Sequence, residues 1–181
     1  MVIPDSFWAE ELLIFEAMLY KFLLDTARLG AANALPGGAG VGINWALVNK
    51  NVAAWAARYT AELVKGITAT TKTATQAAIA AWIESGNPID DLFVALEPLF
   101  GADRAEMIAV TEVTQAYQAG NLIAWREAGA SGWEFRTSED DLVCEICGPL
   151  NMTRWGMDDE SNSPPRHPRC RCWSVPVIEL P

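Results

Sequence analysis

The sequence predicts a mainly α-helical protein, in which a helical body is followed by a small C-terminal β/zinc-knuckle module. Two observations carry this prediction. Apolar residues recur at helical spacing as far as about residue 128, between glycine and proline signals that start and stop helices. Beyond Gly132 the pattern changes to short β-prone stretches and turn formers, and this part holds all four cysteines and the single histidine.

The first helix is predicted from Ser6 to Leu29, with Asp5 or Ser6 as its cap and Gly30 as its end. Its apolar positions occupy far more than one stripe, so the helix must be covered on several sides. Either the rest of its own domain covers it, or it docks on another subunit. The residues that we single out for docking are Phe7, Trp8, Leu12, Phe15, Leu19 and Phe22.

The glycine-rich stretch AANALPGGAGVG, residues 31–42, is typical of a loop or hinge. A phosphate-binding loop would require Gly-Lys-Ser/Thr at its end, whereas Gly42 is followed by Ile43 and Asn44. We therefore predict a hinge rather than a nucleotide site.

The remainder of the body is predicted to be helical up to the start of the knuckle module. The expected helices are Asn44 to about Lys65 with Gly66 as the stop, 68–86, 87–101 closed by Pro98 and Gly101, and about Arg104 to Ala128. Two strands are expected at 133–138 and 172–180. We divide the chain into an apolar docking helix (1–30), a helical body with the hinge at its start (31–131) and a metal-knuckle module (132–181).

Composition and charge limit the possible partners. The 181 residues are 51% apolar, which is enough for a folded core, and the formal net charge of −10 repels phosphate backbones. DNA contact is therefore expected to be local at most. The N-terminus lacks a basic signal region, and charges interrupt the apolar stretch after it, so we expect a cytoplasmic protein without a membrane span. In that compartment clustered cysteines more often bind metal than form disulfides.

The C-terminal cluster has the spacing C-x2-C, then nineteen residues, then H-x2-C-x-C. Sulfur and nitrogen donors in this pattern favour a tetrahedral structural zinc ion. Four ligands are needed and five are present: we choose Cys144, Cys147, His167 and Cys170, with Cys172 as an alternate for one of the last two. Arg166, Arg169 and Arg171 would offset the negative charge of the thiolates. Reduced cysteines packed without metal, and disulfides, remain open alternatives.

The same residues do not match a catalytic motif. A zinc deaminase requires H-x-E, but Pro168 and Arg169 follow His167, and a metalloprotease helix requires two histidines. A cysteine–histidine nucleophilic pair would have to form within a proline-bound loop. When every strong ligand is used to saturate the ion, no position remains for a reactive water. We therefore predict a protein that is not an enzyme.

Two stretches resemble a known family. The helix IAVTEVTQAYQAGNLIAWREAG (108–129), and WEFRTSEDDLVCEICGPL (133–150) followed by HPRCRC (167–172), are similar to the phage head morphogenesis family, also called phage Mu protein F-like. Its members are minor capsid proteins of tailed phages and prophages. The resemblance covers about Asn49 to Pro176, and the second stretch is the more specific.

The resemblance implies a minor head protein, made in the host bacterial cytoplasm and incorporated in several copies at the portal vertex or head interior. Its partners would be the portal protein, the major capsid protein or both, reached through the helix from Phe7 to Leu29. Thr111 and Glu112 are expected to brace the knuckle, for instance through Arg136, rather than to catalyse. Two alternatives stay open: a free-standing zinc-knuckle interaction adaptor, and a module associated with an enzyme or toxin.

Overall fold

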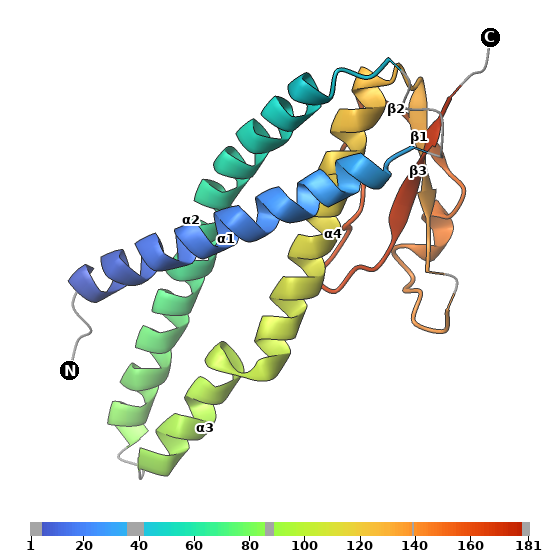
Figure 1. Ribbon diagram of the computed structural model, residues 1–181. Helices are drawn as coiled ribbons and strands as arrows, with labels where there is room; N and C mark the ends of the chain where they lie inside the picture. The colour runs from blue at the N-terminus through green and yellow to red at the C-terminus, as the bar shows by residue number, and fades with distance from the viewer. Residues whose placement is uncertain (1–4, 36–41, 86–88, 139, 179–181) are drawn as a thin grey trace.

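The computed structural model describes residues 5–35, 42–85, 89–138 and 140–178 (Figure 1). Its elements are α1 (Asp5–Asn33), α2 (Trp45–Ser85), α3 (Ile89–Phe100), α4 (Ala102–Glu127), β1 (Gly132–Arg136), the 3-10 turn η1 (Gly148–Leu150), β2 (Arg154–Gly156) and β3 (Trp173–Val177). The prediction of a mainly helical protein with a small C-terminal β module is confirmed. The three domain boundaries stay predictions, and residues 36–41 of the predicted hinge lie outside the described residues.

The long helices α2 and α4 run in opposite directions, and α3 connects them at one end (Figure 1). The helix α1 crosses both of them, and the small sheet lies beside α4. Among the described residues, no helix combines the length and the apolar character that crossing a bilayer requires. The helix α4 therefore lies at the centre of the fold, since it contacts all three other helices and strand β3.

The crossing of α1 and α4 is closed by small residues. Gly30 lies inside α1, so the prediction that it ends the helix is wrong. A Cβ at Gly30 would lie 2.2 Å from the carbonyl oxygen of Tyr117, and one at Gly120 would lie 1.9 Å from that of Ala27. Both glycines are thus required by the close approach of two backbones. The indole nitrogen of Trp125 donates to the carbonyl of Ala34 (2.6 Å) beside this crossing.

The helix α2 begins as predicted, because the side chain of Asn44 accepts a hydrogen bond from the amide of Leu47 (3.1 Å). The predicted stop at Gly66 is wrong, since α2 continues without a break to Ser85. A glycine ends a helix when it takes a left-handed conformation, and among the described glycines only Gly42 and Gly129 have a positive φ. Gly66 is an ordinary helical residue with no atom of another segment near it.

The C-terminal ends of α3 and α4 are formed by different hydrogen-bond patterns. Pro98 was expected to close α3, but it lies inside the last turn, and the amide of Gly101 then bonds to the carbonyl of Glu97 (2.6 Å). At the end of α4, Gly129 (φ +75°) donates to the carbonyl of Arg126 (3.2 Å). The amide of Ala130 bonds to the carbonyl of Trp125 (3.0 Å), which completes a Schellman motif. This motif turns the chain directly into the sheet.

The sheet has the strand order β2-β1-β3, and both pairings are antiparallel. Strand β2 was not predicted, because three residues are too few to show a period. Trp133 and Trp155 are register partners, and their rings stack with centroids 4.8 Å apart. Glu134, buried in the central strand, accepts from the Arg154 side chain (2.7 Å) and lies 2.5 Å from that of Arg136.

One continuous core joins the helices to the knuckle module. Its fully buried large side chains include Leu23 of α1, Val52 of α2 and Trp125 of α4. The same cluster extends to Trp133, Phe135, Cys147, Cys170 and Cys172. Three of the five predicted metal ligands are therefore part of the hydrophobic core, and Cys144 packs against it.

Candidate metal centre

The five predicted ligands come together at the C-terminal end of the core. Cys144, Cys147 and His167 form one group, and Cys147, Cys170 and Cys172 form another, with the ligand atoms of each group within 4.8 Å of one another. Cys144 and His167 are half-buried, whereas the other three are buried. All four cysteines are free thiols, so the disulfide alternative is not realised.

The spacing of the donor atoms fits a small tetrahedral ion. The His167 Nε2 atom lies 3.1 Å from the Cys144 sulfur and 3.3 Å from the Cys147 sulfur. The sulfurs of Cys147 and Cys170 are 3.8 Å apart. Zinc–sulfur bonds of about 2.3 Å at the tetrahedral angle place two sulfurs about 3.8 Å apart. The cluster can therefore hold a metal ion. Cys147 belongs to both groups, and its second group contains both Cys170 and Cys172. The choice of Cys170 over Cys172 as the fourth ligand therefore stays a prediction.

The orientation of the imidazole suits a ligand. The Nδ1 atom of His167 lies 2.8 Å from the carbonyl oxygen of Pro168, and a carbonyl can only accept, so Nδ1 carries the proton. The lone pair of Nε2 then faces the sulfurs of Cys144 and Cys147. A hydrogen bond of this kind from the distal nitrogen fixes the tautomer of metal-bound histidines.

Local turns form both halves of the cluster. The carbonyl of Cys144 accepts from the amides of Cys147 (3.2 Å) and Gly148 (2.9 Å), which folds the C-x2-C segment so that both sulfurs lie on one side. In the second half, the amide of Cys170 bonds to the carbonyl of His167 (3.1 Å). The two halves meet because β1 and β3, which precede and follow them, are neighbours in the sheet.

The thiols have different electrostatic environments in the absence of metal. Hydrogen bonds from the Cys147 backbone lower the pKa of Cys144. Burial, with the neighbouring Cys170 sulfur as the next cause, raises the pKa of Cys147 above its usual value and that of Cys172 to about 11. Buried thiolates so close together repel one another, and a bound cation would remove that penalty.

The helix α4 holds the second half of the cluster by two threonines. The hydroxyl of Thr114 donates to the carbonyl of Cys170 (2.9 Å), and the amide of Arg169 donates to the Thr111 hydroxyl (3.0 Å). The side chain of Arg169 also bonds to the carbonyl of Asp103 (2.9 Å). The bracing role predicted for Thr111 is thus observed. Thr114 was missed, although it follows Thr111 at the i, i+3 spacing that places both on one face of the helix.

The arginines of the second cluster contact oxygen atoms of the protein. Arg171 forms an ion pair with Asp140 (2.8 Å), and Arg166 donates to the carbonyl of Ser161. The Asp140 carboxylate also accepts from the amide of Leu142 (3.1 Å), so it ties residue 171 to the start of the C-x2-C loop. The Arg171 contact thus joins the two halves of the cluster, whereas the Arg166 contact is local to the second half. Charge compensation of the thiolates by the arginines stays a prediction.

Glu112 contacts Tyr59 rather than Arg136, contrary to the expectation. It is 6% exposed and accepts a hydrogen bond from the phenol of Tyr59 in α2, while Arg136 pairs with Glu134. Burial raises the pKa of Glu112, and burial followed by the negative charge of Glu112 raises that of Tyr59. The pair therefore connects α2 and α4 inside the body.

The predicted docking residues fall on both described and undescribed positions. The side chains of Phe7, Trp8, Leu12 and Phe15 lie outside the described part of the chain, Leu19 is half-buried, and Phe22 is 40% exposed. Sequence reasoning did not select five exposed apolar residues of α1: Leu13, Ile14, Met18, Tyr20 and Leu29, which are 66%, 60%, 67%, 36% and 57% exposed. Burial of Leu23, Ala27 and Ala31 shows that the protein itself covers the later turns of α1.

The fold and the site define a helical protein whose C-terminal sheet presents a cysteine–histidine cluster that can hold a metal ion. The family model described as phage Mu protein F like protein matches residues 73–175, more than half of the chain, so the chain belongs to this family. Searches of curated proteins and of solved structures found no match. Family membership confirms the resemblance seen in the sequence, and it makes this a phage head-related protein.

Proposed function

We propose that the protein is a non-enzymatic minor head component of a tailed phage or prophage, which docks through α1 on the portal or major capsid protein. The observation that carries the proposal is family membership over residues 73–175. In this proposal the protein is made in the host cytoplasm and is incorporated in several copies at the portal vertex or head interior. The metal cluster supports a structural role, because Cys147, Cys170 and Cys172 belong to the core and Cys144 packs against it.

The exposed face of α1 supports docking. Ile14, Met18 and Phe22 follow one another at i, i+4 spacing, which places them on one stripe, and all three are at least 40% exposed. An apolar stripe of this kind is the typical recognition surface of a helix that binds in a groove. The buried turns from Leu23 onward anchor the helix to the body, so the stripe is presented in a fixed direction.

The test is affinity purification of the tagged chain from cells that assemble phage heads, with nuclease present, followed by quantitative mass spectrometry. We expect portal or capsid protein to remain bound. Met18→Glu should abolish this association, because a charge is added to the apolar stripe. Val94→Glu on α3 is the matched control, since Val94 is equally exposed at 68%. Unchanged association of Met18→Glu, or equal losses in both variants, would refute docking through α1.

The second part of the proposal is that the cluster binds one structural zinc ion. Cys144, Cys147, His167 and Cys170 supply three thiolates and one imidazole, a ligand set typical of closed zinc sites. Such an ion would connect the C-x2-C turn to the 167–172 segment. The role of the ion would be structural, because four protein ligands leave no open coordination position for water or substrate.

Metal content and stability test this part. Protein purified without chelator should contain one zinc per chain by elemental analysis. Cys147→Ser should lose it, because Cys147 belongs to both groups of ligands. Cys172→Ser is the matched control, which removes a buried thiol of the same cluster and should retain the metal. Absence of stoichiometric metal from the wild type would refute the zinc site. Loss of zinc from Cys172→Ser would mean that Cys172, and not Cys170, is the fourth ligand.

A further inference from the structure

A cleft runs between α2 and α4 and is closed at one side by the loop that contains residues 160–163. Its volume is about 440 Å³. The α2 wall carries Asn51, Trp55 and Arg58, which recur at helical spacing on one face. The α4 wall extends from Gln115 to Arg126. At 1.5 Å per residue this wall is roughly 16 Å long, which matches about five residues of extended peptide.

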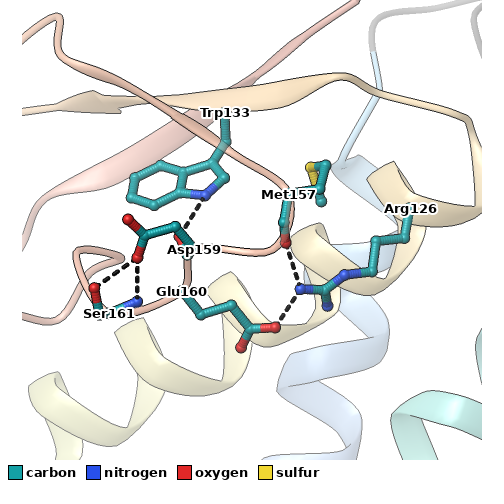
Figure 2. Close-up of polar contacts among 6 residues, drawn as sticks. All are labelled: Arg126, Trp133, Met157, Asp159, Glu160 and Ser161. Atoms are coloured by element: carbon teal, nitrogen blue, oxygen red, sulfur yellow. Dashed lines mark hydrogen bonds and ion pairs between the residues drawn. The ribbon is translucent and has the colours of Figure 1, made fainter.

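The loop at the cleft is held in place by contacts with α4 and β1 (Figure 2). The Arg126 guanidinium donates to the carbonyl of Met157 (2.8 Å) and pairs with the carboxylate of Glu160. The indole nitrogen of Trp133 donates to the carbonyl of Asp159 (3.1 Å). Arg126 and Glu160 both line the cleft, so the side of the cleft next to this loop is formed by an ion pair whose charges cancel.

The floor of the cleft contains an unsatisfied polar group. Gln118 is 2% exposed, and its side-chain oxygen accepts from the Ser174 hydroxyl (2.6 Å). Its side-chain nitrogen has no hydrogen-bond partner among the residues that the structure describes. The amide is therefore packed against β3 beneath the cleft, and its nitrogen is closed off from the cleft itself.

The charges that line the cleft do not favour binding of a polyanion such as a nucleic acid. Arg58 and Arg126 are balanced by Glu127 and Glu160, so the lining is formally neutral. Nucleic-acid grooves are instead lined by an excess of cations. Within the described part of the chain, Arg58 has no ion pair, whereas Arg126 is paired with Glu160. One free guanidinium in a neutral cleft matches a single carboxylate on the bound molecule.

An apolar surface completes the cleft beside Arg58. The rings of Trp55 and Tyr59 stack with centroids 5.0 Å apart, which fixes the indole, and Leu122 and Ile123 lie on the facing helix. We propose that this cleft binds an extended peptide segment of a partner protein, with a carboxylate on Arg58 and an apolar side chain against Trp55. The site is separate from the exposed stripe of α1 and adds a second partner surface to the proposed function.

The experiment selects a displayed random-sequence peptide library on the full-length protein. We expect enriched peptides that carry an aspartate or glutamate beside an apolar residue. Binding of a synthetic copy, measured by fluorescence polarisation, should weaken about 10- to 100-fold in Arg58→Glu, because a charge-assisted contact is replaced by repulsion. Selection on Arg58→Glu should enrich lysine or arginine at the same position. Arg28→Glu makes the same charge change on the exposed surface of α1 and should bind the acidic peptide like wild type.

A second variant tests the cleft without changing its charge. Ala54→Trp, at an exposed position of the α2 wall, should fill the cleft and abolish peptide binding while leaving the unfolding temperature unchanged. The proposal is overturned if no peptide is enriched, if Arg58→Glu or Ala54→Trp binds as wild type does, or if a single-stranded oligonucleotide probe binds through Arg58 instead. Met18→Glu should retain peptide binding, so failure of the α1 docking proposal and failure of this one give different results.

Discussion

The crossing of α1 and α4 allows a quantitative prediction from one methyl group. In Gly120→Ala the new Cβ would lie 1.9 Å from the carbonyl oxygen of Ala27 and 2.8 Å from the amide nitrogen of Ala31. Both obstructing atoms belong to a helix backbone, which cannot change rotamer as a side chain can. The two helices must therefore move apart by about 1.5 Å to restore ordinary van der Waals contact.

The cost of this movement is large compared with the stability of a domain. A gap of about 0.5–1 Å already removes a quarter to a half of the dispersion energy of a contact, and Ala27 and Ala31 both lie at this crossing. Overpacking typically costs about 1–3 kcal/mol, and an obstructed backbone belongs at the upper end, so we expect about 3 kcal/mol. For a chain of this size that lowers the unfolding temperature by roughly 6–12 °C.

Thermal unfolding followed by circular dichroism measures the effect, and Gly66→Ala is the control. Gly66 also lies inside a helix, but a Cβ there meets no atom within 4 Å. The control should therefore gain about 0.4–1 kcal/mol from the lower entropy of the unfolded chain. Both substitutions share that gain, so their difference isolates the helix crossing. If Gly120→Ala unfolded at or above the temperature of Gly66→Ala, the close approach of α1 and α4 would be refuted.

Four further predictions concern the core and the cluster. A strong chelator should abolish the near-ultraviolet dichroism of the knuckle module but leave most of the helical signal, because α1, α2 and α4 also contact one another directly. Coincident loss of both signals would contradict this prediction. Trp125→Phe should lower the free energy of unfolding, measured with denaturant, by about 1–3 kcal/mol, because the Ala34 carbonyl loses its hydrogen-bond donor. Unchanged stability would argue against that hydrogen bond. Thr114→Val should weaken zinc binding about tenfold in competition with a chelating dye, and equal affinity would exclude a positioning role. Burial raises the pKa of Glu112, so the native state holds this proton more tightly than the unfolded chain, and stability falls as pH rises above about 4.5. Glu112→Gln should therefore gain stability relative to wild type between about pH 4.5 and neutrality, in unfolding curves measured across that range, and a constant difference would contradict the raised pKa.

Local signals were sufficient for most elements and for the cysteine–histidine cluster that can hold a metal ion. Asn44 caps α2 as its position before an apolar period predicts, and the C-x2-C spacing predicted a turn that places two sulfurs together. Such features depend on neighbours in the chain, so one sequence contains them.

The glycines show where local reasoning stopped. Gly30 and Gly66 were predicted to end helices, but both lie inside them, and the left-handed glycine that follows a helix is Gly129 at the end of α4. Gly30 is needed because the backbone of Tyr117, distant in the sequence, passes close to it. The cleft between α2 and α4 was missed for the same reason, since its two walls are separated along the chain. The contact of Thr114 with Cys170 likewise depends on how α4 meets the module.

The position of α1 in the chain has a consequence for the order of folding. The main partner of α1 is α4, and Ala27 and Gly120 are separated by about ninety residues, so synthesis at 5–20 residues per second leaves α1 without α4 for roughly 5–20 s. During this interval Leu23 and Ala27 are as accessible as Ile14 and Met18. A nascent α1 is therefore apolar along most of its length, and a ribosome-associated chaperone or a neighbouring nascent chain would meet it before its own bundle does.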